Sequence, residues 1–185
     1  MKSNEIASSA YTLKAGIYNV DPNHTNVGFT IRHMVIANVK GQFDKFGGTF
    51  VLDGKTKTLK SLVGEVDVGS VNTNNTQRDA DLKSSNFFDA ARFPKMELVL
   101  DDVKGNTAYG KLTIHGITKD IQMVFETSDF SVKDPWGSMR TGLSLSGSIN
   151  RKDFGLNWDQ TIENGALIAG EEIQINVEIE GILVE

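Results

Sequence analysis

The chain has 185 residues, enough for a single domain with a sizeable core, and carries a formal net charge of -5. This acidic balance argues against a general binder of nucleic acids or anionic membranes, which needs a dense basic face. Cysteine is absent, which excludes disulfides, thiolate catalysis and thiolate metal sites.

Residues 1–15 are polar and irregular, and we expect a loose lead-in there, followed by one folded domain over residues 16–185. The lead-in lacks the apolar stretch of a secretory signal. No run of about 18 apolar residues occurs, so we expect no transmembrane segment. As written, the chain is expected to be cytoplasmic, whereas a leader removed ahead of residue 1 would make it periplasmic or secreted.

Alternation of apolar and polar side chains, the period of a strand with one buried face, recurs along the chain. It is clear over residues 26–34, where Val27, Phe29 and Ile31 share one face. His33 continues this row, and an imidazole can lie there only if its ring nitrogens find partners. By the same criterion, strands are expected over residues 17–21, 26–34, 39–52, 62–71, 96–100, 111–115, 121–126, 143–149 and 173–180.

The alternation breaks after residue 71, where the sequence predicts its one helix, over about residues 76–85. Asn74 and Asn75 precede this helix as capping candidates. Leu82 is its only large aliphatic residue, and three phenylalanines follow it closely, at positions 87, 88 and 93. The segment is interpreted either as a lid against an apolar opening or as a connector packed outside a sheet.

About eight or nine alternating strands, short turns, one helix and no βαβ rhythm predict an antiparallel sandwich or a closed barrel. Glycines inside the strands, such as Gly28, Gly64, Gly110 and Gly147, favour the strong curvature of a barrel. A barrel of about eight strands either fills its interior with side chains or holds one small ligand. Both arrangements remain open at this point.

Catalytic and metal-binding patterns are weak. No Gly-x-Ser-x-Gly elbow occurs, and no spacing supports a Ser-His-Asp set. His24, His33 and His115 would hold a metal only if the fold brought them together, so we assign no metal site and no catalytic residue. Arg78 and Asp79, at the start of the expected helix, are interpreted either as a surface ion pair or cap, or as contacts for a polar group of a ligand.

Several longer motifs follow one another in a specific order, although each is unspecific alone. They begin with YNVDPNHT and lie at residues 18–25, 29–34, 39–43, 72–73, 78–84, 87–89, 93–94, 110–119 and 149–156. With these motifs the chain resembles the YceI-like, polyisoprenoid-binding family from about Ile17 to its C-terminus. Thr25 stands where the family usually has serine, a change that keeps the hydroxyl.

The resemblance implies an all-β fold, an extended lipocalin-like antiparallel β-barrel of about eight strands with one short α-helix. It also implies that the interior holds a long-chain apolar lipid, such as a polyisoprenoid, an isoprenoid quinone or a fatty-acid derivative. The protein would carry, store or protect this lipid, with no cofactor and no catalytic activity. Many members of the family carry an export signal and are periplasmic. An exposed edge strand would also allow a homodimer.

We therefore expect the lipid tail to contact apolar side chains inside the barrel, and its head group to contact His33, Arg78 and Asp79. Two alternatives stay open. One is an enzyme of isoprenoid or quinone metabolism that uses His33 or His24 as general base. The other is a structural or stress-associated protein with a filled core. The residues expected to contact the tail are Val27, Phe29, Ile31, Phe43, Leu82, Phe88, Met96, Leu98, Leu112 and Ile114.

Overall fold

The computed structural model describes residues 12–184, which form one antiparallel sheet and one α-helix. Within the expected lead-in, residues 1–11 lie outside the described part, and residues 12–15 are irregular. The elements are β1 (Gly16–Val20), β2 (Asn26–His33), β3 (Ala37–Phe43), β4 (Phe46–Asp53), β5 (Thr58–Asp67), β6 (Val71–Asn72), α1 (Thr76–Lys83), β7 (Lys95–Lys104), β8 (Thr107–Ile114), β9 (Ile117–Thr127), β10 (Val132–Lys133), β11 (Met139–Asn150) and β12 (Ala169–Leu183).

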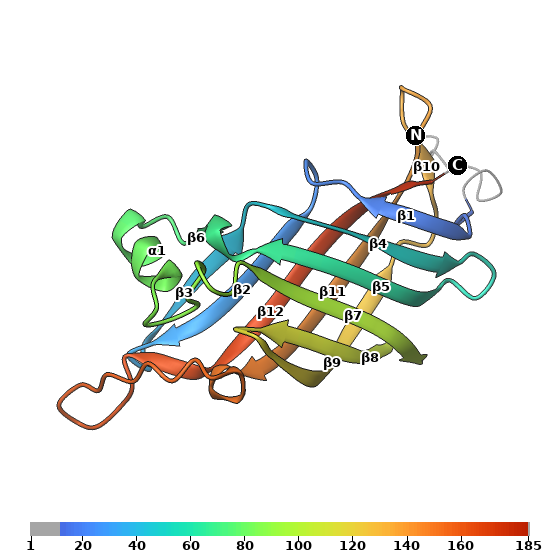
Figure 1. Cartoon of the computed structure of the whole chain (residues 1–185). Helices are drawn as coiled ribbons and strands as arrows, with labels where there is room; N and C mark the ends of the chain where they lie inside the picture. The colour runs from blue at the N-terminus through green and yellow to red at the C-terminus, as the bar shows by residue number, and fades with distance from the viewer. Residues whose placement is uncertain (1–11, 185) are drawn as a thin grey trace, which may run out of the picture.

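Eight strands close into a barrel (Figure 1). Their order is β11, β9, β8, β7, β5, β4, β1 and β12, and β12 pairs again with β11 to complete the ring. Each neighbouring pair in the ring is antiparallel. The expected all-β, antiparallel barrel with a single short helix is confirmed. Within the described residues, no helix is both long and apolar enough to cross a membrane.

One long strand gives the barrel two different ends. The C-terminal part of β12 pairs with β1, where Tyr18 lies opposite Leu183. The N-terminal part of the same edge pairs instead with β2, where Val27 lies opposite Val177. Strands β3 and β6 extend the sheet outward from β2, and α1 lies beside them (Figure 1). The barrel therefore has a β1 end and a β2–β3 end.

The β1 end is filled by side chains. The rings of Tyr18 and Phe50 stack with centroids 5.3 Å apart, and both residues are fully buried beside Leu59 and Leu100. Gly181 makes room for this stack, because a Cβ there would lie 2.4 Å from the Phe50 ring. Such dense packing leaves no space for a guest molecule inside the barrel at this end.

The sequence pattern predicted two strands that extend further than those in the structure. The run over residues 39–52 divides into β3 and β4, and the run over 62–71 ends as a strand at Asp67. The Asp67 carboxylate accepts a hydrogen bond from the Gly69 backbone N–H, and a 3₁₀ turn over Val68–Ser70 replaces the strand. The Ser70 hydroxyl in turn accepts from the Lys45 backbone N–H between β3 and β4. Alternation reports which face a side chain occupies, but it does not detect polar side chains that capture backbone amides.

The predicted helix is confirmed with slightly different bounds, Thr76–Lys83. Asn75 is its cap, since its side chain accepts a hydrogen bond from the Arg78 backbone N–H at 2.9 Å. Asn74, the other candidate, has a left-handed backbone with a φ of 59° and lies outside the helix.

Candidate ligand-binding cavity

The β2–β3 end of the barrel is hollow. A cavity of about 720 Å³ lies there, with a wall that is mostly apolar. Its volume falls within the range of about 300–1,000 Å³ that is usual for small-molecule sites. Val27, Phe29 and Ile31 of β2 line this cavity, and they are only half-buried because the space that they face is open. The filled and hollow ends together make a blind tunnel.

All ten residues expected to contact a lipid tail lie on the wall of this cavity. They come from β2, β3, α1, the segment after α1, β7 and β8. That these residues contact a ligand remains a prediction. The ten are Val27, Phe29, Ile31, Phe43, Leu82, Phe88, Met96, Leu98, Leu112 and Ile114.

Sequence reasoning missed much of the cavity wall. Alternate residues of β12 face the cavity, although β12 lies in the run with the clearest alternation in the sequence. That alternation was the signal that could have placed them. The missed wall residues include Leu62, Val66, Ile121, Met123, Leu145, Ile149, Trp158, Ile168, Ile173, Ile175, Val177 and Ile179.

A series of aromatic contacts runs from the wall toward the opening. Phe43 contacts Phe29 and Phe88, with ring centroids 5.5 Å and 6.2 Å away. Phe87 contacts Phe88 and also Trp158, at 6.2 Å and 5.4 Å. These pairs join β2 and β3 to the segment after α1 and to the loop before β12. Because Leu82 and Phe88 lie on the wall, this arrangement favours the lid interpretation of the helical segment.

The three residues expected at the head group have different positions. His33 and Arg78 line the cavity, but Asp79 does not. Arg78 and Asp79 do not pair with each other, because both are engaged by Thr73. The Asp79 carboxylate accepts from the backbone N–H and hydroxyl of Thr73 at 2.8 Å and 2.6 Å. The Arg78 guanidinium donates to the hydroxyl and carbonyl oxygens of Thr73 at 2.8 Å and 2.9 Å. Asp79 therefore positions Thr73 at the start of α1.

The loop before β12 is held by a buried arginine. Arg151 is fully buried, although it lies in the polar run Asn150–Asp153, which directly follows a strand and would ordinarily form a solvated turn. Its guanidinium donates to the carbonyl oxygens of Leu156, Ala169 and Gly170, and to the Asp159 carboxylate. These bonds fix the two ends of the loop that carries Trp158 and Ile168 onto the wall. The acceptors are mostly backbone carbonyls brought close by the fold, so no sequence pattern marks them.

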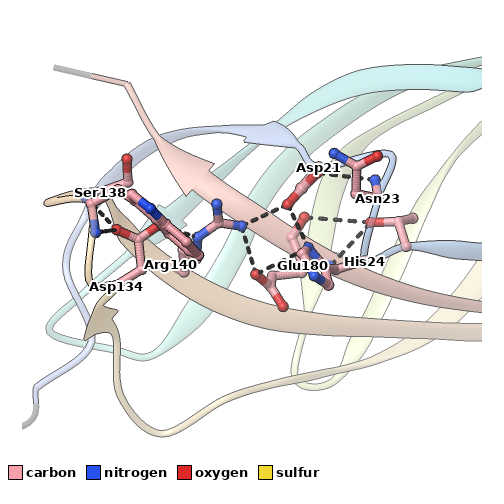
Figure 2. Close-up of polar contacts among 9 residues, drawn as sticks. Asp21, Asn23, His24, Asp134, Ser138, Arg140 and Glu180 are labelled. Carbon is pink, nitrogen blue, oxygen red and sulfur yellow. Dashed lines mark hydrogen bonds and ion pairs between the residues drawn. The ribbon is translucent and has the colours of Figure 1, made fainter.

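A separate polar cluster lies where β12 changes partner from β1 to β2 (Figure 2). Arg140 Nη1 donates to Asp21 at 2.6 Å and to Glu180 at 2.7 Å, and its Nε donates to Asp134 at 2.6 Å. His24 Nδ1 lies 2.8 Å from the Asp21 carboxylate. Hydrogen bonds from His24 and Arg140 lower the pKa of Asp21 to about 2, although burial opposes this shift. The same bond to Asp21, together with the charge of Glu180, raises the pKa of His24.

The fold does not bring the three histidines together. Among residues 12–184, the one group with metal-ligand spacing is Asp21, His24 and Glu180, whose ligand atoms lie within 4.8 Å of one another. Arg140 Nη1 already contacts both carboxylates of that group, so a fixed positive charge stands where a cation would bind. His33 lies on the cavity wall, and His115 belongs to the β8–β9 turn, against the Phe93 ring at 4.5 Å.

Comparison with known proteins agrees with this geometry. The sequence profile of the YceI-like domain matches residues 18–181. A UPF0312 protein of Staphylococcus aureus is 32% identical over 165 residues, which cover 88% of this chain and 95% of the relative. The crystal structure of a Campylobacter jejuni YCEI protein, 30% identical, superposes with a TM-score of 0.71 over 83% of this chain and 90% of that one. A polyisoprenoid binding domain from Saccharophagus degradans shares the fold, with 15% identity and a TM-score of 0.67 over 92% and 100% of the two chains.

Proposed function

The chain belongs to the YceI-like domain family, and we propose that it binds one long-chain apolar lipid with the tail inside the barrel. The observation that carries this proposal is the apolar cavity of about 720 Å³ at the β2–β3 end. Side chains beside an empty space lose van der Waals contacts on that side, and an apolar occupant restores them. The fold that the chain shares with the polyisoprenoid binding domain supports a polyisoprenoid as the ligand. We extend the proposal to isoprenoid quinones and fatty-acid derivatives, because they have similar apolar tails.

Affinity would come mainly from the tail. Burial of apolar surface contributes about 25 cal/mol per Å², so a tail that buries some hundreds of Å² contributes several kcal/mol before the cost of ordering. His33 and Arg78 lie on the wall toward the opening, where they would contact a polar head group. Arg78 is already hydrogen-bonded to Thr73, which holds its guanidinium in place for such a contact. The bound lipid would be carried, stored or protected.

A binding role fits the site better than turnover. His33 is the only histidine on the cavity wall among the described residues, and its side chain has no hydrogen-bond partner there. A general base is usually oriented by a hydrogen bond to a second group, and His33 has no such bond in the described structure. The alternative general base, His24, lies outside the cavity and is held by Asp21.

The test compares lipid content in two matched variants on β7. Leu98→Arg places a charge on the cavity wall, whereas Val99→Arg places the same charge on the outer face of the same strand. Native mass spectrometry of the purified protein should detect an apolar mass on the wild type and on Val99→Arg, with at least a tenfold loss on Leu98→Arg. Circular dichroism would confirm that both variants fold. Equal lipid content in the two folded variants would contradict the proposal.

A further inference from the structure

The turn that joins β2 to β3 exposes an apolar tip, which consists of Met34, Val35 and Ile36. The exposed fraction of Ile36 is 80% and that of Val35 is 59%. These two residues follow one another directly, so their side chains form a small projecting apolar surface. Single exposed apolar residues are ordinary, whereas exposed apolar residues that gather into one surface mark contact sites.

The backbone of this tip is unusual for its residue types. Met34 and Val35 both have a left-handed conformation, with φ of 48° and 67°. A β-branched side chain is strongly disfavoured there, and glycine or asparagine would make the turn with less strain. The Met34 N–H donates to the Ile168 carbonyl at 2.8 Å, which holds the turn in place. Turn formation does not explain why the residues are apolar, and strained residues of this kind gather at functional sites.

The tip also lies beside the cavity opening. His33, which immediately precedes it, lines the cavity, and so does Ile168, to which Met34 is hydrogen-bonded. An apolar lipid that leaves this opening into water loses the favourable burial of its tail. A path from the cavity directly into another apolar phase avoids that loss.

The charges on the hairpin suit a lipid head-group region. Between Asp21 and Asp44 the sequence contains no acidic residue, but it contains Arg32 and Lys40. Both basic side chains are exposed. Because the whole chain carries a net charge of -5, we do not expect a whole face of the protein to attract anionic lipid head groups. The attraction would be confined to this hairpin. An exposed apolar tip with a basic side chain beside it at Arg32, and a second one along the same hairpin at Lys40, combines apolar and basic groups as interfacial helices do.

We propose that the β2–β3 tip docks onto the surface of a lipid bilayer, so that the lipid passes between bilayer and cavity without entering water. The inference rests on the proposed lipid-binding function. With two inserted side chains the attachment should be weak and reversible, as repeated loading and release require.

The first experiment measures flotation of the protein with phosphatidylcholine vesicles, with and without phosphatidylglycerol. The double variant Val35→Ser, Ile36→Ser should lose at least tenfold in vesicle partitioning, and the wild type should partition better when phosphatidylglycerol is present. The control is Trp136→Ser. Trp136 is 85% exposed in the β10–β11 turn. This turn lies near the C-terminal end of β12, whereas the tip lies near the N-terminal end of the same strand. This variant should partition like the wild type. Equal partitioning of the double variant and the wild type would overturn the proposal.

A second experiment separates this proposal from lipid binding itself. Transfer of a fluorescent fatty acid from vesicles should be at least tenfold slower in the double variant, while its equilibrium affinity for the same fatty acid added from ethanol stays unchanged. Leu98→Arg should still float with vesicles but take up no fatty acid. Vesicle binding without any uptake by the wild type would refute the lipid-binding function alone. Docking alone would be overturned if the wild type and the double variant took up the fatty acid at equal rates. It would also be overturned if the wild type formed a dimer that the double variant abolished, without binding vesicles.

Discussion

Asp21 is 4% exposed, and its charge is balanced by His24 and Arg140 rather than by water. Removing one partner of such a cluster leaves the others without compensation, which costs more than the cluster contributes as a whole. Because the cluster joins the end of β1 to β11 and β12, its loss should loosen the place where β12 changes partner (Figure 2). The cluster is thus a structural feature that lies outside the cavity.

This cluster predicts a specific pH dependence of stability. The pKa of Asp21 is lowered from 3.8 to about 2, so its contribution is full above pH 3.8 and is lost as pH falls through about 2. The pKa of His24 is raised above 6.5, so its contribution is full below that value and is lost as pH rises through the raised pKa. Thermal unfolding should therefore show that Asp21→Asn costs about 2 kcal/mol near pH 5 and almost nothing below pH 2.

Asp129→Asn is the matched control, because the Asp129 side chain is 83% exposed and pairs only with Lys57 in the described structure. Its effect should be within about 0.5 kcal/mol at every pH. A destabilisation by Asp21→Asn that does not vary between pH 2 and pH 8 would contradict the role assigned to its charge.

At the scale of elements, α1 forms one border of the opening and is held there mainly by polar contacts, with Leu82 as its one apolar side chain packed against the core. None of its residues is fully buried, although Leu82 and Arg78 line the cavity. The bonds from Asp79 and Arg78 to Thr73 attach the helix to the end of β6. A segment held in this way opens more readily than the strands of the barrel.

Asp79→Ala should therefore change the rate of lipid release more than the affinity. The variant removes two hydrogen bonds to a carboxylate that does not line the cavity, worth about 1.5–3 kcal/mol each. Amide hydrogen exchange over α1 should become at least tenfold faster, and a bound fatty acid should dissociate faster. Lys83→Ala, on the same helix, should change neither rate. Unaltered exchange in Asp79→Ala would show that this contact does not hold the helix.

Elements also show how far the sequence predicts the structure. The inward faces of β2, β7 and β8 followed from alternation, because the period of two belongs to the residues themselves. The inward face of β12 was missed, although the same pattern marks it, since a shift of one residue reverses the face and only the pairing with β2 settles it. The expected strand over residues 62–71 was wrong at its end, and the burial of Arg151 was not predicted, because each depends on backbone groups brought close by the fold.

At the scale of the whole molecule, the barrel combines a solid half with a hollow half. Tyr18 and Phe50 fill the β1 end, so the packing there is complete without a ligand. The β2–β3 end bears the cavity, the helix and the exposed apolar tip. This division should let the protein stay folded while one end is empty, as the proposed role in carrying or storing a lipid requires.

The two tryptophans report separately on the two ends of the barrel. Trp158 lines the cavity, whereas Trp136 lies in the β10–β11 turn beyond the filled end. Quenching of their fluorescence by a fatty acid brominated along its chain tests the central claim directly, since bromine quenches only on contact. We predict saturable quenching of Trp158 in a Trp136→Phe variant at one fatty acid per chain, no quenching of Trp136 in a Trp158→Phe variant, and loss of the effect with Leu98→Arg. Equal quenching of both tryptophans, or quenching that persists with Leu98→Arg, would contradict a lipid bound inside the barrel.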